Sequence, residues 1–127
     1  MPRTRASRAS ASGTKNSDPG DPVAQWDVYA NPSPRSRDDL PYLIDVQSDL
    51  LGVLGTRLVV PLSRQTELPG GLPRRMTPLF IIREETLRLV PQEAGAIDAS
   101  VLRRAVSSLR ADAHRIVDAL DAVVSGV

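Results

Sequence analysis

Two carboxylates in the stretch Asp45-Val46-Gln47-Ser48-Asp49 are the side chains best suited to chemistry in this sequence. Carboxylates four residues apart can act as a general acid and base, or can bind a divalent cation. The stretch has no neighbouring histidine, no third acid and no glycine-rich phosphate loop. We therefore expect a structural role, in which Asp45 and Ser48 accept hydrogen bonds from turn backbone at the end of a strand.

Basic residues and the single histidine are the other candidates. Arg74, Arg75 and Arg83 could contact phosphate, but a formal charge of +1 and an aromatic content of 3% favour a solvated surface. His114 has no serine or cysteine nucleophile pattern around it. With one histidine and no cysteine, metal centres built on several imidazoles or on thiolates are excluded. The residues therefore predict no catalytic set, no metal site and no cofactor.

The composition indicates the class of protein. A chain of 127 residues is long enough for one domain. Its near-neutral charge predicts no sequence-specific binding of nucleic acid. No apolar run reaches the roughly 18 residues of a membrane span, and the N-terminus lacks the apolar centre of a secretory signal. We expect a soluble, cytoplasmic protein without a membrane partner, and the absence of cysteine is compatible with a reducing compartment.

The chain divides into a tail and a domain. Residues 1–22 are rich in Arg, Ser, Ala and Gly, and Val23 is the first aliphatic residue after Met1. Such a segment cannot bury enough apolar surface to offset its ordering entropy, so we expect a disordered tail. An arm that contacts nucleic acid is the alternative for this tail. The domain should comprise residues 23–127.

Short apolar runs bounded by turn residues predict about five strands. In residues 25–29, alternation places Trp26 and Val28 on one face and Tyr29 on the other, as in a half-buried strand. The last two runs flank the polar triplet Arg83-Glu84-Glu85 and are typical of a hairpin. The expected strands are residues 25–29, 42–46, 56–62, 77–82 and 86–90.

The pattern becomes helical after the last strand. Residues 101–109 have helical spacing, although their valines and serines suit a strand or turn nearly as well. Gly126 should fray the end of a C-terminal helix. The whole is a small β-rich α+β domain with a thin core, for which a dimer sharing apolar surface is plausible. The one-sided apolar stripe of the terminal helix consists of Ala113, Ile116, Val117, Leu120, Val123 and Val124.

The order of these segments resembles the CcdB toxin family. The most specific element is the pentapeptide Asp45–Asp49, written DVQSD, which in this resemblance ends a strand and begins a turn. A strand that contains Val28 and Tyr29 precedes it. A strand at Arg57–Val60 follows it and ends at Pro61-Leu62. The resemblance covers residues 23–127 and continues through Arg74, Pro78, the LFII run, Glu85, Arg88, Leu109 and Gly126.

The resemblance implies a fold and a function. The expected fold is an SH3-like β-barrel of the CcdB and MazF type with a C-terminal α-helix, assembled as a homodimer. The expected function is the toxin of a toxin–antitoxin pair in plasmid maintenance, with no catalysis of its own. Such a toxin binds the A subunit of DNA gyrase and traps the cleaved complex. A cognate CcdA-like antitoxin neutralises it by winding a disordered segment over its surface.

The resemblance also implies site residues. The gyrase contact is expected at the end of the helix, where Ser125 stands in place of the family's tryptophan. The antitoxin is expected on the loops at residues 31–41 and 65–73. The expected contacts are Val124, Ser125, Gly126 and Val127 for gyrase, and Arg35, Arg37, Asp38, Glu67, Leu68 and Leu72 for the antitoxin.

Two alternatives follow from the same residues. With Ser125 at the anchor position, the protein could bind its antitoxin without poisoning gyrase. It could instead be an endoribonuclease like the MazF and Kid toxins, which share the barrel. Such an enzyme needs a positive groove and a proton-transfer set, for which the candidates are Arg74, Arg75, Asp45 and His114.

Overall fold

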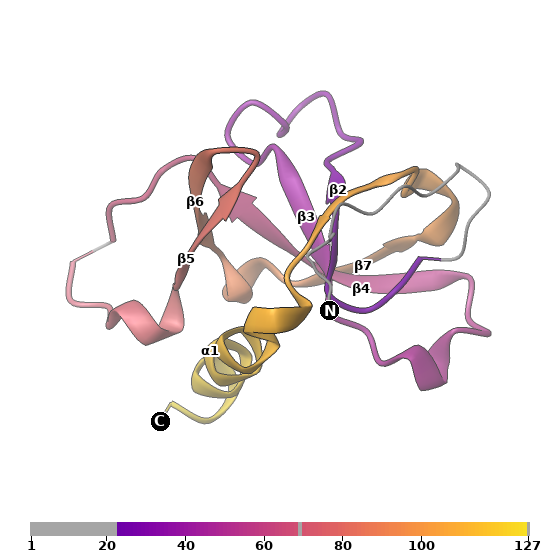
Figure 1. The fold of residues 1–127 in the computed structure, drawn as a ribbon. Coiled ribbons are helices and arrows are strands. Elements are labelled where there is room, and N and C mark those ends of the chain that lie inside the picture. The colour runs from indigo at the N-terminus through magenta and orange to yellow at the C-terminus, as the bar shows by residue number, and fades with distance from the viewer. Residues whose placement is uncertain (1–22, 69, 127) are drawn as a thin grey trace.

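The computed structural model describes residues 23–68 and 70–126. The predicted tail at residues 1–22 and the site residue Val127 therefore lie outside the described residues. One antiparallel sheet curls around a core, and the C-terminal helix packs against it (Figure 1). This is the barrel-like α+β architecture that the sequence predicts.

Within the described residues, seven strands form the sheet, in the order β5-β6-β4-β3-β2-β8, with β7 paired to β4 off this path. The long strand β4 causes the curl. One edge of β4 pairs with β3, while its other edge pairs first with β7 and then, from Leu62, with β6. The strands are β2 (Asp27–Ala30), β3 (Tyr42–Asp45), β4 (Thr56–Ser63), β5 (Leu79–Ile82), β6 (Glu85–Leu89), β7 (Gly95–Asp98) and β8 (Ala105–Ser108).

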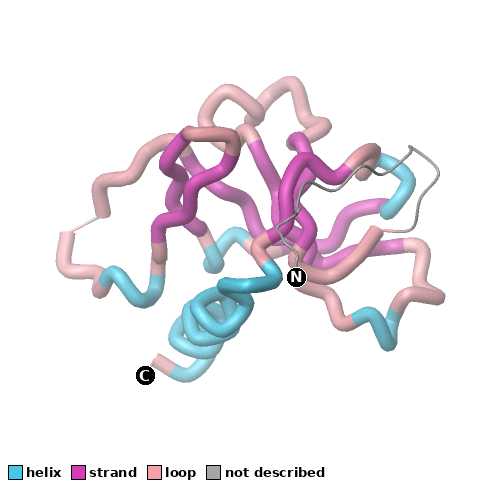
Figure 2. Tube along the Cα trace, viewed as in Figure 1, coloured by secondary structure: helices cyan, strands magenta, loops and turns pink. Residues whose placement is uncertain are grey.

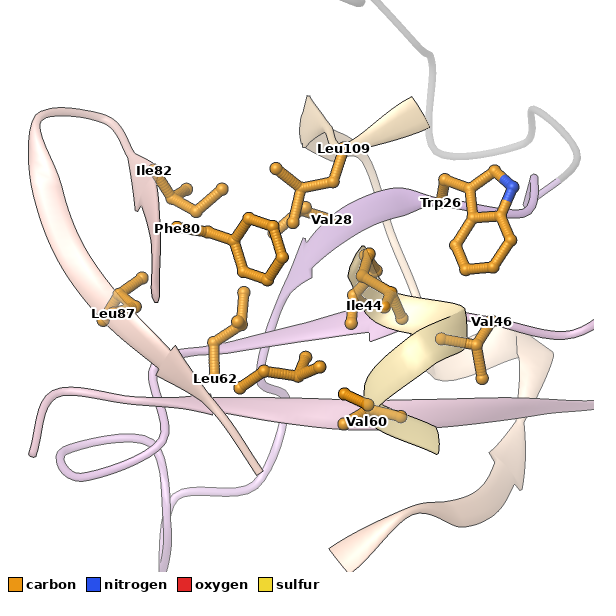
Figure 3. Close-up of a cluster of buried hydrophobic side chains, with 13 residues drawn as sticks. Trp26, Val28, Ile44, Val46, Val60, Leu62, Phe80, Ile82, Leu87 and Leu109 are labelled. Carbon is orange, nitrogen blue, oxygen red and sulfur yellow. The ribbon is translucent and has the colours of Figure 1, made fainter. Parts of the chain in front are cut away.

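Both faces of the central strands are buried. Val28, Ile44 and Val60 are aligned by the pairing of β2, β3 and β4, and they point into the main core drawn in Figure 3. Tyr29 and Leu43 point the other way, into a second cluster. The predicted alternation is confirmed for Val28 and Tyr29, but the strand begins at Asp27, because Trp26 lies in a turn with φ of 75°. The strand is also not half-buried, because a second cluster covers its other face.

Three local features complete or refine the predictions. Residues 105–108, for which the sequence left helix and strand open, form β8, because they pair with β2. The segment Gly95–Asp98 forms β7, which the sequence did not predict. The hairpin of β5 and β6 has a two-residue turn, since Glu85 pairs with Ile82. Its turn residues Arg83 and Glu84 have φ angles of 51° and 69°, the left-handed region typical of a type I′ turn.

The C-terminal helix α1 (Ala113–Ser125) packs Ile116 and Ala119 against the main core. Its predicted apolar stripe is only partly buried, because Val117, Val123 and Val124 are exposed. Gly126 does not fray the helix. It adopts a left-handed conformation, with φ of 78°, and its N–H donates to the carbonyl oxygen of Ala122 at 2.8 Å. No helix in the described ranges is long and apolar enough to cross a membrane.

Candidate functional site

A buried ion pair forms the base of the DVQSD stretch. Asp45 ends β3, and Arg57 lies near the start of the neighbouring β4. The Nε of Arg57 donates to Oδ2 of Asp45 at 2.7 Å, and the two side chains are 2% and 0% exposed. The other carboxylate oxygen of Asp45 accepts from the backbone N–H of Gln47 at 2.9 Å. Both oxygens of Asp45 are therefore occupied and shielded from solvent.

Burial governs the protonation of this pair. Burial raises the pKa of the Asp45 carboxyl above its ordinary value, and the hydrogen bonds from Arg57 and from the Gln47 backbone limit the rise. Burial also opposes the charge of Arg57, but the Asp45 carboxylate outweighs it and raises the pKa of the guanidinium. The predicted structural role is confirmed, because Asp45 caps turn backbone and Ser48 Oγ accepts from the Leu50 N–H at 3.2 Å.

Arg57 is the member of this network that sequence reasoning missed. It lies two residues before Val59, which pairs directly with Asp45. Alternation along β4 therefore places Arg57 on the same face as Asp45. The sequence did contain a signal for this ion pair. Arg57 is a charged residue at an inward position of an apolar strand, and the neighbouring strand ends in aspartate.

The side chain of Gln47 connects the beginning of the loop that follows β3 with the beginning of β4. Its Nε2 donates to the carbonyl oxygens of Leu51 and Thr56 at 3.3 and 3.1 Å. Its Oε1 accepts from the N–H of Leu58 at 3.0 Å. The side chain is buried, so one amide forms hydrogen bonds to three backbone groups, although the Leu51 carbonyl also accepts from the Leu54 N–H.

The loop between β3 and β4, which we call the apolar loop (Asp49–Gly55), exposes hydrophobic side chains. It begins with one turn of 3₁₀ helix, η1 (Asp49–Leu51), visible in Figure 2 between the two strands. Contiguous exposed apolar residues mark interaction sites. The sequence predicted only a turn here, because exposure cannot be read from composition. The exposed fractions are 91% for Leu50, 48% for Leu51, 94% for Val53 and 48% for Leu54.

The residues expected to bind gyrase lie on the surface at the end of α1. Val124 is 87% exposed, and Ser125 and Gly126 are also exposed. The Ser125 hydroxyl donates to the carbonyl oxygen of Asp121 at 2.7 Å, so it is used within the helix. The described part of the helix end thus presents an apolar valine beside a glycine and carries no large anchor.

Arg115 anchors α1 to strand β5. Its guanidinium lies over the ring of Phe80, 4.4 Å from the ring centre. Its Nη2 donates to the carbonyl oxygen of Leu79 at 2.8 Å. A stacked, hydrogen-bonded arginine fixes the helix against the sheet. These contacts attach the first turn of α1 to the sheet, and the exposed end lies at the other end of the same helix.

The two loops expected to bind the antitoxin meet at Arg64. Its Nη1 donates to the Asp38 carbonyl oxygen at 2.6 Å, and its backbone N–H donates to that of Asp39 at 2.9 Å. Its Nε bonds to Glu85 Oε2 at 2.7 Å, which ties the first loop to β6. Of the predicted contacts, Arg35, Arg37, Asp38, Glu67 and Leu72 are exposed, and Leu68 is half-buried.

The elements that carry Arg74, Arg75 and His114 pack against each other, but Asp45 is not available for a ribonuclease site. Arg74 and Arg75 are exposed on the 3₁₀ helix η2 (Arg74–Met76), and His114 is exposed on α1. Asp45 is fully buried and bonded to Arg57, so it cannot reach a substrate. Within residues 23–68 and 70–126, no group of three or more histidine and acidic side chains could hold a metal ion.

Comparison with known protein families shows which family the sequence resembles. The sequence model of the family described as "CcdB protein" matches residues 25–126. The matched range begins just before β2 and ends at the glycine that caps α1. It therefore includes the buried ion pair, Gln47, the apolar loop and both loops that meet at Arg64.

Proposed function

Because this chain belongs to the CcdB family, we propose that it is the toxin of a type II toxin–antitoxin pair that inhibits DNA gyrase. In this proposal it acts by binding and without catalysis: it binds the gyrase A subunit and traps the cleaved complex, in the cytoplasm, until a CcdA-like antitoxin removes it. The observation that carries the proposal is the exposed apolar end of α1, a helix whose first turn Arg115 attaches to β5.

Two exposed apolar segments support a protein-binding role. Val124 at the end of α1 and the apolar loop present aliphatic side chains to solvent without covering a core. A rigid apolar surface loses little conformational entropy when a partner covers it. We propose that Val124, Ser125, Gly126 and Val127 contact gyrase, with the apolar loop as a second contact.

Ser125 determines how strong this contact can be. Its small side chain is hydrogen-bonded to the Asp121 carbonyl and offers no aromatic surface. Interface anchors of the tryptophan type often cost about 2 kcal/mol or more when truncated. The second candidate function, an antitoxin-binding protein that no longer poisons gyrase, rests on this observation.

The antitoxin surface is proposed on the two loops joined by Arg64. Arg35, Arg37 and Asp38 on the first loop and Glu67 on the second present charges of both signs, while Leu68 and Leu72 add apolar contacts. A disordered antitoxin segment of mixed composition could follow such a surface. Arg64 is added to this set because it holds the first loop in place.

A homodimer completes the proposal. Ile81 on β5 is 69% exposed, and Val117 and Val123 on α1 are 42% and 39% exposed. The core of one copy contains few aromatic residues. A dimer interface would bury these aliphatic side chains in addition to that core. Apolar surface of this kind supports a second copy as the occupant. The size of the full-length protein in solution tests this part of the proposal.

A cleavage and supercoiling assay tests the gyrase proposal. The full-length chain is added to gyrase with ATP and plasmid, beside Ser125→Trp. Cleaved DNA that accumulates with the unmodified chain, and disappears when antitoxin is added, is the expected result. Accumulation with Ser125→Trp alone would favour the second candidate function. No cleaved DNA with either protein, when both are folded, would contradict gyrase poisoning.

A further inference from the structure

We propose that Gln47 is a positioning residue, which holds the apolar loop in a protruding conformation that is ready to bind a protein partner. The partner surface that suits this loop is an apolar groove, because Leu50 and Val53 at the loop are 91% and 94% exposed. The inference rests on the proposed function, which makes gyrase that partner. It assigns to the DVQSD stretch a role in presenting a surface, beyond ending a strand.

The hydrogen bonds of Gln47 join the first turn of the loop to strand β4. Its Nε2 is bonded to Leu51, inside the loop, and to Thr56, where β4 begins. Its Oε1 is bonded to Leu58, further along β4. One side chain thus fixes the distance between the loop's first turn and the strand that follows it.

Gln47 is itself fixed by the buried ion pair. Its backbone N–H donates to Asp45 Oδ1 at 2.9 Å, and its carbonyl oxygen accepts from Arg57 Nη2 at 3.2 Å. The Asp49 carboxylate accepts from the Gln25 N–H at 3.1 Å and lies 3.5 Å from the same Nη2. The loop therefore begins from a rigid, fully hydrogen-bonded base.

Apolar packing does not hold the loop. None of the residues of η1 is buried, and Val53 and Leu54 also face solvent. A loop without buried side chains normally opens at low free-energy cost. Here the backbone is ordered by polar contacts while the apolar side chains stay free. This combination leaves the side chains available and reduces the ordering cost on binding.

The test compares Gln47→Met with Leu50→Ala in the full-length protein. Methionine has a similar length but removes all three hydrogen bonds, while Leu50→Ala removes apolar contact area and keeps the loop's framework. In Gln47→Met we expect hydrogen exchange at the Leu51, Gly52 and Leu54 amides to accelerate by about tenfold or more. The amides of the β2–β3 pair should be unchanged, and Leu50→Ala should leave loop exchange unchanged.

Binding measurements complete the test. Gln47→Met should weaken gyrase binding on the order of tenfold, mainly through slower association, because the loop must then be ordered during binding. Leu50→Ala should act mainly on dissociation, and antitoxin affinity should be the same for both variants. Faster loop exchange with unchanged gyrase affinity would overturn the proposal, and so would unchanged loop exchange in Gln47→Met.

A milder variant covers the case in which Gln47→Met does not fold. Gln47→Glu retains an acceptor for the Leu58 N–H and loses both donations to the loop carbonyls. It should give the same selective loop exchange with the sheet intact, and uniform acceleration over the sheet would overturn the proposal. If the unmodified protein does not bind gyrase, the proposed function fails, while the exchange data still decide whether Gln47 holds the loop.

Discussion

Arg57 Nε lies 2.7 Å from Asp45 Oδ2, and both side chains are almost completely buried. Removing one partner of such a pair leaves the other charge without compensation. Asp45→Ala should therefore lower the free energy of unfolding by about 3–5 kcal/mol. Denaturant unfolding measures this loss. Replacing both partners, Asp45→Leu with Arg57→Met, should recover part of it, and a double variant no better than Asp45→Ala would contradict the explanation.

The same pair predicts a pH dependence for Arg57→Met. Burial raises the pKa of Asp45 above the ordinary 3.8, and removing Arg57 lets it rise further. A folded-state pKa above the unfolded value gives a contribution that is complete below pH 3.8 and is lost as the pH rises through the folded pKa. Arg57→Met should thus lose more stability than wild type on going from about pH 4 to 7. Parallel unfolding curves across this range would contradict the prediction.

The β5–β6 turn predicts a stabilising substitution. Arg83 and Glu84 hold left-handed φ angles that cost a residue with a side chain roughly 1 kcal/mol each. Arg83→Asn with Glu84→Gly should therefore raise the free energy of unfolding by about 1 kcal/mol. The midpoint of urea unfolding should increase at constant slope. Glu84→Ala, which keeps a β-carbon at the same φ, is the matched control and should give no gain.

Removing the contacts of Arg115 should lower the stability of the protein by loosening helix α1 from the sheet. Arg115→Met keeps the aliphatic stem but removes the contact with Phe80 and the hydrogen bond to Leu79, so it should cost about 1–2 kcal/mol. The preceding residue, His114, is exposed, and His114→Ala should change stability by less than about 0.5 kcal/mol. Thermal unfolding compares the two.

His114→Ala should also remain toxic, and messenger RNA should stay intact in cells that express it. Loss of toxicity in this variant would support the ribonuclease alternative.

Substitutions on the two proposed surfaces should weaken the binding of different partners. Val124 is 87% exposed, so Val124→Asp should leave the fold unchanged while it weakens gyrase binding by at least about tenfold. Arg64→Met releases the Asp38 loop and should weaken antitoxin binding instead. Titration of each variant against both partners measures the pattern. A variant that affects both partners equally would contradict two separate surfaces.

Local chemistry could be predicted from the sequence where it depended on short-range spacing. The caps made by Asp45 and Ser48 are an example, because a short polar side chain bonds backbone two residues away. The alternation of Trp26, Val28 and Tyr29 is another. The caps are present in the structure, and Val28 and Tyr29 do face opposite sides, although Trp26 reaches the main core from a turn that precedes the strand.

Features that depend on distant pairing could not be predicted. The spacing of Ala105 to Ser108 suits a helix or a strand, and pairing with β2 decides between them. Arg57 is surface-like by residue type and becomes buried only because Asp45 lies across the strands. The exposure of Leu50 and Val53 is likewise invisible in a sequence, since apolar residues predict burial.

The pairing of β2 with β8 affects how the protein is made on the ribosome. Asp27 pairs with Ser108, so the first described strand acquires this neighbour only after most of the chain has been synthesised. Helix α1, which follows all of these strands in the chain, then closes the same core. Until that point the nascent chain exposes aliphatic residues of the core, and such surface is prone to aggregation. A prematurely terminated product therefore lacks both a closed core and the end of α1, and should be degraded without harming the cell.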